Sequence, residues 1–451
     1  MSSTNVSLTI SSKQPAAVAA CRSAMLGYAQ RKTSVVADLQ TAIKHDPECA
    51  FAHAALGLML HGARNSAFKS KTAGCLEQAE MYRAAATEHE ATYIDALAAS
   101  TRGDLAGFSK HIEHALALQP TDIFGLSLAQ SELFWTGCME QSLAISERVL
   151  PHWNESVEGY AEFLASRAFD LEEANRFDEA EDCGRQSVDL NPASVWATHA
   201  VAHVLLMQGR CAEGVDWITP QERHWDDCNQ IKFHVWWHKC LFNIENGQLD
   251  AALDTYDSHV RNRQHELLQA MPDLYIDLQN GASLLWRLEH TGIDVGERWQ
   301  EMAEVVGARL EDNSSPFTSA HFAMILAAVA SFDQCDRLIE SMQAFSEQEA
   351  THALAGRYAE AGIPAACAAV EHRKGNFGKV VEILMPVRQK LWQMGGSHAQ
   401  QDIFFQILVD AAAREGRIDD VRKLLQEIEL IGFVEPAKRT GYAAAVALVD
   451  A

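Results

Sequence analysis

The chain has 451 residues, of which 48% are hydrophobic, so it is long enough to bury a large core. Its 37 Lys and Arg against 61 Asp and Glu give a net charge of −24, which argues against nucleic acid or an anionic membrane as the main partner. No apolar run is long enough for a membrane span, and the start, MSSTNVSLTISSKQP, lacks the basic and apolar regions of a signal peptide. We therefore expect a cytoplasmic protein.

Apolar residues recur at helical spacing along almost the whole chain, as in AFAHAALGLML at 50–60 and LVDAAA at 408–413. Only 11 prolines and 26 glycines interrupt this pattern, and no segment alternates as a strand would. Ten scattered cysteines without a CxxC pair indicate reduced, packed thiols. The sequence predicts an all-α protein.

An internal repeat follows from three similar segments in which a polar-Pro step separates two helices. Their prolines, Pro47, Pro120 and Pro192, lie 73 and 72 residues apart, which is about two units near the tetratricopeptide period of about 34. Turns such as ANRFDEAEDC and NGQLDAALDTY fit the tight turn and second helix of such units. We expect a right-handed superhelix of about eleven tetratricopeptide-like hairpins, with residues 1–15 as an extension and residues 16–451 as one continuous unit.

Two histidine pairs stand at i,i+4 spacing inside apolar helical runs: His199 with His203, and His234 with His238. Residues four apart share one helix face, so each pair presents two imidazoles in one direction. Measured back from the glycine that closes each helix, the histidines fall at positions that differ by threes and fours. All four are therefore expected on equivalent faces of two neighbouring first helices, toward the concave side of the superhelix.

Three interpretations of these histidines remain open. They can hold a divalent transition metal through neutral ring nitrogens, with a carboxylate from Asp277 or Asp402. They can form a metal-free pocket for a small ligand or for acid–base catalysis. They can also be hydrogen-bonded core residues packed by tryptophans such as Trp237, which we include among the candidate ligand-binding residues. The spacing HAVAH lacks the glutamate of His-Glu-x-x-His, so a metalloprotease is not expected.

Further candidates follow in the second half of the chain. Asp277 and Asn280 either face the pocket as polar residues or lie in an exposed first turn of a helix. His321, a lone histidine on an apolar helix, is more typical of a core residue. In GGSHAQQD, His398 lies at a helix start that either favours an anion or is simply capped by Ser397. Glu172 and Glu173 are expected on an ordinary solvent face.

The chain resembles the tetratricopeptide repeat protein 38 family nearly from end to end. The similarity rests on RVLPHW, AFDLEEANRFDEAE, WATHAVAHVLLMQGR, FHVWWHKCLFNIENGQLDAALDTYD, ASLLWRLEHTGIDVGERW and GGSHAQQDIF. The resemblance implies a superhelical repeat fold and little about chemistry. The polar positions shared with the family are His199, His203, His234, His238, Asp277, His321, His398 and Asp402.

Two positions depart from that family. Gln401 stands where the family commonly has Arg, and Asn280 stands where it has Asp. Loss of one cation and one carboxylate is compatible with a changed ligand or with a lost activity.

Two classes of function fit the sequence. One is a His/Asp-lined pocket that binds a small polar or anionic molecule or a divalent metal, with a catalytic role left open. The other is a scaffold that binds a partner peptide in its concave groove. Peptide-binding repeats of the carboxylate-clamp kind place Lys, Arg and Asn on first helices, whereas this face offers His, Trp and Asp. We therefore favour the small-ligand or metal site.

Overall fold

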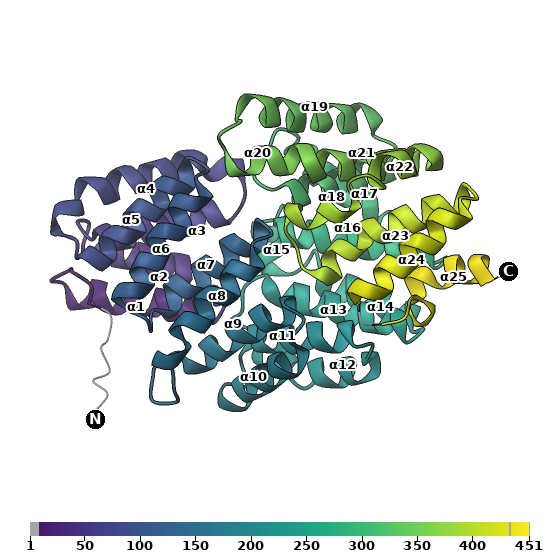
Figure 1. The fold of residues 1–451 in the computed structure, drawn as a ribbon. Helices are drawn as coiled ribbons and strands as arrows, with labels where there is room; N and C mark the ends of the chain where they lie inside the picture. Colours follow the sequence, from purple (N-terminus) through teal and green to yellow (C-terminus); the bar gives the residue numbers. More distant parts are fainter. Residues whose placement is uncertain (1–8, 433, 451) are drawn as a thin grey trace.

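The structure, a computed structural model, describes residues 9–432 and 434–450 and is built almost wholly of α-helices (Figure 1). Within these ranges it has no β-strand, and the one β-bridge joins Lys32 to Cys228. The predicted all-helical fold is confirmed. Of the expected extension at residues 1–15, residues 1–8 lie outside the described part, and the first helix begins at Pro15.

Over the described ranges the helices pair into eleven consecutive hairpins, the number expected from the length. The first five hairpins pair α1 (Pro15–Ala29) with α2 (Val35–His45), α3 (Ala50–Gly62) with α4 (Lys69–Met81), α5 (Glu88–Thr101) with α6 (Leu105–Leu118), α7 (Ile123–Trp135) with α8 (Met139–Val149), and α9 (Tyr160–Glu173) with α10 (Phe177–Leu190).

The next six hairpins pair α11 (Val195–Met207) with α12 (Cys211–Ile218), α13 (Ile231–Glu245) with α14 (Leu249–Thr255), α16 (Tyr275–His290) with α17 (Arg298–Val306), α18 (Pro316–Ala328) with α19 (Phe332–Gln348), α21 (Ile363–Arg373) with α22 (Phe377–Leu384), and α23 (His398–Arg414) with α24 (Ile418–Gly432). The remaining α-helices of the described part are α15 (Glu266–Ala270), α20 (Ala353–Arg357) and α25 (Ala443–Asp450).

First and second helices differ in burial as a repeat superhelix requires. The first helix α11 is buried on all sides, whereas the second helix α10 buries only one face, which includes Phe177, Ala180 and Val188. Gly209 and Gly247 end α11 and α13 with φ of 70° and 73°, a left-handed conformation that costs glycine little. These glycines fix where each histidine helix stops, and hence the register of its side chains.

The superhelix closes on itself, which encloses the first helices of its middle hairpins. The guanidinium of Arg309 donates to the Arg64 carbonyl at 2.8 Å, and the Ala353 amide donates to the Gly103 carbonyl at 2.9 Å. Near the C-terminal end, α23 packs against both α11 and α16 (Figure 1). This contact brings residues separated by about half of the chain to one site.

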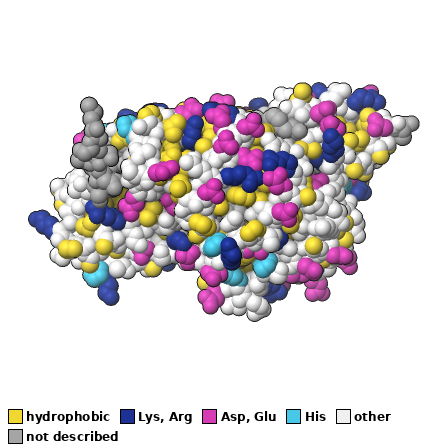
Figure 2. Space-filling model, turned by 90° about the horizontal axis from the view of Figure 1, so that it is seen from below, with side chains coloured by type: hydrophobic (Ala, Val, Ile, Leu, Met, Phe, Trp, Pro, Cys, Tyr) yellow, Lys and Arg dark blue, Asp and Glu magenta, His cyan; other side chains and the backbone are white. Residues whose placement is uncertain are grey.

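The surface carries both signs of charge. On the face shown in Figure 2, Lys and Arg side chains are interleaved with Asp and Glu and do not gather into a separate basic patch. In the described part of the chain, every helix is too short or too polar to cross a lipid bilayer.

Candidate functional site

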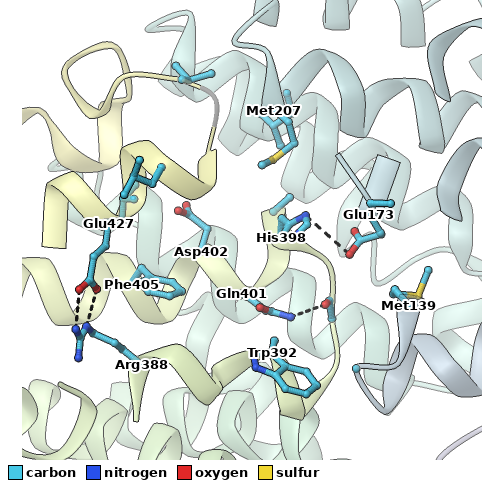
Figure 3. Close-up of a pocket in the computed structure, with 18 of the residues that line it drawn as sticks. Met139, Glu173, Met207, Arg388, Trp392, His398, Gln401, Asp402, Phe405 and Glu427 are labelled. Carbon is cyan, nitrogen blue, oxygen red and sulfur yellow. Dashed lines mark hydrogen bonds and ion pairs between the residues drawn. The ribbon is translucent and has the colours of Figure 1, made fainter. Parts of the chain in front are cut away.

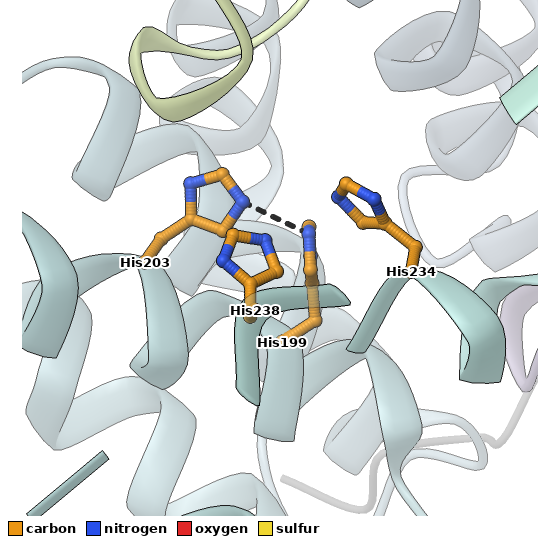
Figure 4. Close-up of side chains that lie close together, drawn as sticks. All are labelled: His199, His203, His234 and His238. Atoms are coloured by element: carbon orange, nitrogen blue, oxygen red, sulfur yellow. Dashed lines mark hydrogen bonds between the residues drawn. The ribbon is translucent and has the colours of Figure 1, made fainter. Parts of the chain in front are cut away.

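The four paired histidines come together in one cluster between α11 and α13, which we call the histidine tetrad (Figure 4). One ring nitrogen from each residue lies within 4.8 Å of one from each of the others. The ring centroids of His199 and His203, and those of His203 and His238, are 4.4 Å apart. The register set by the two helix-ending glycines thus produces a single group of imidazoles from two hairpins.

The tetrad is enclosed in the protein and its rings are neutral at physiological pH. None of the four residues is more than 4% exposed. Burial disfavours the imidazolium form, so the pKa of His203 and that of His234 fall to about 3. Burial, together with the neighbouring imidazoles, also lowers the pKa of His199 and His238 well below the usual range. Neutral rings with free lone pairs are the form of histidine that binds metals.

Hydrogen bonds satisfy only part of the tetrad. The Nε2 atoms of His199 and His203 lie 2.9 Å apart, and Nδ1 of His234 lies 2.8 Å from Oδ1 of Asn280. Neither ring nitrogen of His238 has a hydrogen-bond partner among the described residues, and Nδ1 of His199 has none either. Leaving a buried polar group unpaired costs about 1–3 kcal/mol, so these nitrogens call for a partner other than the described side chains, such as an ordered water molecule or an ion.

The carboxyl group beside the tetrad belongs to Glu172, which the sequence analysis had placed on a solvent face. That expectation was wrong: α9 is a first helix, Glu172 is fully buried, and its Oε2 lies 3.3 Å from Nδ1 of His203. Burial raises the pKa of Glu172 to about 8. Asn175 ends α9 with φ of 61°, as the two glycines end α11 and α13. Glu172 comes three residues before Asn175, which places it on the same helix face as the histidines. Applying the same count to α9 would have found it.

A second polar group continues from Glu172 toward a cavity. One ligand atom from each of Glu172, Glu173 and His398 lies within 4.8 Å of the others, and Nδ1 of His398 is 4.0 Å from Oε2 of Glu173 (Figure 3). Burial and the neighbouring Glu172 carboxylate raise the pKa of Glu173 well above its usual range. Glu173 and His398 line a cavity of about 1010 Å³, whereas the tetrad does not.

The sequence-predicted candidates thus fall into two places rather than one pocket. His398 and Asp402 line the cavity, and Asp402 is held there by the guanidinium of Arg439 at 2.7 Å. Asp402 is therefore paired with the C-terminal segment and not with the histidines. The carboxyl group near the imidazoles is that of Glu172. Gln401 donates to the Gly396 carbonyl at 2.7 Å, also in the cavity wall.

Three further candidates lie apart from the cavity. Trp237 stacks on His234 with centroids 5.1 Å apart and donates its Nε1–H to Ser283 at 3.1 Å. His321 bonds through Nδ1 to the Phe317 carbonyl at 2.8 Å and fits the core role expected for it. Asp277 is fully buried, not in an exposed turn, and neither of its carboxyl oxygens has a hydrogen-bond partner among the described residues.

The start of α23 is an ordinary capped helix. Ser397 accepts the backbone N–H of Gln400, and the Gln400 side chain accepts the Ser397 backbone N–H, which forms a capping box. Donors that an anion would use at this helix end are therefore partly satisfied by the protein.

Comparison with known proteins gives similarity of fold only. No model of a known protein family matches the sequence. The chain is similar to the human IFIT1 dimer with m7Gppp-AAAA, at 15% identity over 95% of both chains and a TM-score of 0.40. It is also similar to yeast Tom70, at 12% identity over 95% of this chain and 87% of that one with a TM-score of 0.35. The P58(IPK) TPR domain is 12% identical over 81% of this chain and 99% of that one, with a TM-score of 0.23.

Proposed function

We propose that this helical-repeat protein binds one divalent transition-metal ion at the histidine tetrad. The observation that carries the proposal is His238: both of its ring nitrogens are buried without a hydrogen-bond partner, and three other neutral imidazoles surround it. A metal ion would take up these lone pairs. Imidazole ligands suit zinc, copper, iron and nickel, and a tetrahedral set of four protein ligands is typical of zinc.

The groups around the tetrad fit this role. Metal-binding histidines usually donate the N–H of the second ring nitrogen to a carbonyl or carboxyl oxygen. This hydrogen bond fixes the orientation of the ring toward the metal. Asn280 does this for His234, whereas Oε2 of Glu172 lies 3.3 Å from Nδ1 of His203 without forming a hydrogen bond to it. Four protein ligands in a buried site leave no open coordination position, so the proposed ion stabilises the superhelix rather than activating water.

The experiment is elemental analysis of the purified full-length protein, combined with thermal unfolding with and without a chelator. We expect close to one transition-metal ion per chain and a lower melting temperature after chelation, because an ion that binds only the folded state stabilises it. Replacing His238 by Gln should remove both the ion and the effect of the chelator.

His321→Gln is the matched control, because His321 is equally buried but lies in a different hydrogen-bonding environment. This variant should keep the metal. A metal-free wild-type protein that zinc, cobalt, nickel and copper salts all fail to stabilise would rule out the proposal. So would equal metal content in wild type and His238→Gln.

We also propose that the chain belongs to the tetratricopeptide repeat protein 38 family, acts in the cytoplasm and forms one domain over residues 16–451. The segments quoted above and the unbroken series of hairpins support this assignment. An alignment of that family in which the four histidines fail to keep their spacing would argue against it. Binding of a partner peptide stays an alternative, although the first helices of the middle hairpins, such as α11 and α13, are almost wholly buried.

A further inference from the structure

The cavity lined by Glu173 and His398 lies next to the tetrad but is chemically distinct from it. It is lined by the C-terminal ends of α9, α11 and α13, by α23 and α24, and also by the start of α8, by Arg287 of α16 and by the segment that precedes α23. Figure 3 shows some of these residues. Its apolar wall includes Met139, Met207, Leu241 and Phe405, with the half-exposed Trp392 at the edge. A volume of about 1010 Å³ is that of a small-molecule site.

The cationic side chains of this cavity are already paired. Its lining includes three arginines and no lysine. Arg388 forms a bidentate salt bridge with Glu427, with both N–O distances 2.6 Å. Arg439 pairs with Asp402 at 2.7 Å, and Arg287 lies 3.6 Å from the same carboxylate. A ligand carboxylate or phosphate would therefore have to break an existing ion pair to find a cation.

Glu173 is the exception among the buried acidic side chains of the wall. Its side chain is 6% exposed, and its Oε1 has no hydrogen-bond partner among the described residues. The nearest basic group is the His398 imidazole at 4.0 Å, too far for a hydrogen bond. Burial keeps this carboxyl group in its neutral, protonated form in the empty cavity, and a cation supplied by a ligand would stabilise the carboxylate and pair with it.

We infer that this cavity binds a small molecule with an apolar body and a positively charged nitrogen group, which pairs with Glu173 beside His398. The apolar body packs on Met207, Leu241 and Phe405, and the aromatic rings of Phe405 and Trp392 also attract cations. The capped start of α23 and the paired arginines disfavour the anionic ligand considered from the sequence. This inference does not depend on the metal at the tetrad.

The test measures binding of three probes of the same length, decylamine, decanol and decanoate, to the full-length protein by isothermal titration calorimetry below their micelle concentrations. We expect decylamine to bind at least about tenfold more tightly than decanol, and decanoate to bind most weakly, because only the ammonium pairs with Glu173. Glu173→Gln should reduce the preference for the amine over the alcohol about tenfold or more while leaving decanol binding unchanged.

Glu140→Gln is the matched control, because Glu140 lines the same cavity but is exposed to solvent. It makes the same Glu-to-Gln change and should leave the preference for the amine intact. Decanoate binding as tightly as decylamine, absence of decylamine binding, or an equal loss in both variants would each overturn the inference. The comparison of the three probes on the wild-type protein decides it even where Glu173→Gln does not fold.

Discussion

Nδ1 of His234 lies 2.8 Å from Oδ1 of Asn280, so the amide of α16 fixes the ring of a histidine on α13. The bond requires Nδ1 to carry the proton, because the amide oxygen can only accept. The other nitrogen, Nε2, is then a lone-pair donor available to the cluster. Asn280 is one of the two positions at which the chain departs from the family that it resembles, where Asp is common.

The first prediction concerns this bond. Asn280→Leu keeps the approximate size of the side chain but removes the acceptor, so His234 loses its orientation and its preferred tautomer. We expect the affinity for zinc to fall by about 10–100-fold, the usual effect of losing such a partner. Asn280→Asp keeps an acceptor and should bind zinc at least as tightly as wild type. Competition with a chromophoric chelator measures both, and equal affinities in Asn280→Leu and wild type would contradict the role.

A second prediction separates a metal centre from a structural cluster. With metal at about 100 times its dissociation constant, the free energy of unfolding should rise by about 2.7 kcal/mol in wild type and not in His199→Gln or His203→Gln. Without metal these variants should be about as stable as wild type, since each removes one unpaired buried Nδ1 together with the Nε2 contact between the two rings. A cost of about 1–3 kcal/mol in metal-free protein, with no response to metal, would favour the structural interpretation.

Helical periodicity was sufficient to predict the fold. Each hairpin is a local unit whose apolar spacing and turn residues are read directly from the chain, and the two glycines after α11 and α13 set the phase of the histidines. The same phase argument, if extended to Asn175, predicts that Glu172 shares their face. Glu172 was not recognised as a site residue because two adjacent glutamates usually lie on a solvated surface.

Closure of the superhelix was not predictable in this way. The cavity forms because α23 packs against α11 and α16, so Glu173 and His398 meet although 225 residues separate them. The sequence records no such long-range pairing. For the same reason Asp402 was considered as a carboxylate for the histidines, whereas its partners Arg439 and Tyr442 lie in the C-terminal segment.

A third prediction is a pH dependence caused by Asp277. Burial raises the pKa of this carboxyl group from 3.8 to about 8 in the folded state, so the folded protein binds more protons than the unfolded chain between these values. The free energy of unfolding that depends on this carboxyl group is therefore greatest below pH 3.8. It falls as the pH rises toward 8, by at most about 1.4 kcal/mol per pH unit.

Asp277→Asn should remove that dependence. Relative to wild type, the variant should gain stability steadily from pH 5 to pH 8 in urea unfolding measurements. The control is Asp250→Asn, which changes an exposed carboxylate in the first turn of α14 and should run parallel to wild type. Identical pH slopes for Asp277→Asn and wild type would show that Asp277 does not titrate in this range.

The last prediction concerns the C-terminal segment. Asp402 accepts two hydrogen bonds from Arg439, one from the Tyr442 hydroxyl and one from the Gln406 amide. The cations of Arg439 and Arg287, together with the Tyr442 hydroxyl, lower its pKa to about 2 despite burial. The interaction is therefore fully formed at neutral pH and is lost only as the pH falls from 3.8 toward 2. Asp402→Asn leaves the guanidinium of Arg439 largely buried without its counter-charge, which costs about 3–5 kcal/mol.

That cost should appear as local opening, because Arg439 and Tyr442 join the segment before α25 to α23. We expect hydrogen exchange across α25 to accelerate strongly in Asp402→Asn, while α11 and α13 exchange as in wild type. Glu435→Gln provides the comparison, since it breaks the solvent-exposed pair between Glu435 and Lys438, worth about 0–1 kcal/mol, in the same segment. Similar exchange rates for α25 in both variants would mean that Asp402 does not hold the C-terminal helix in place.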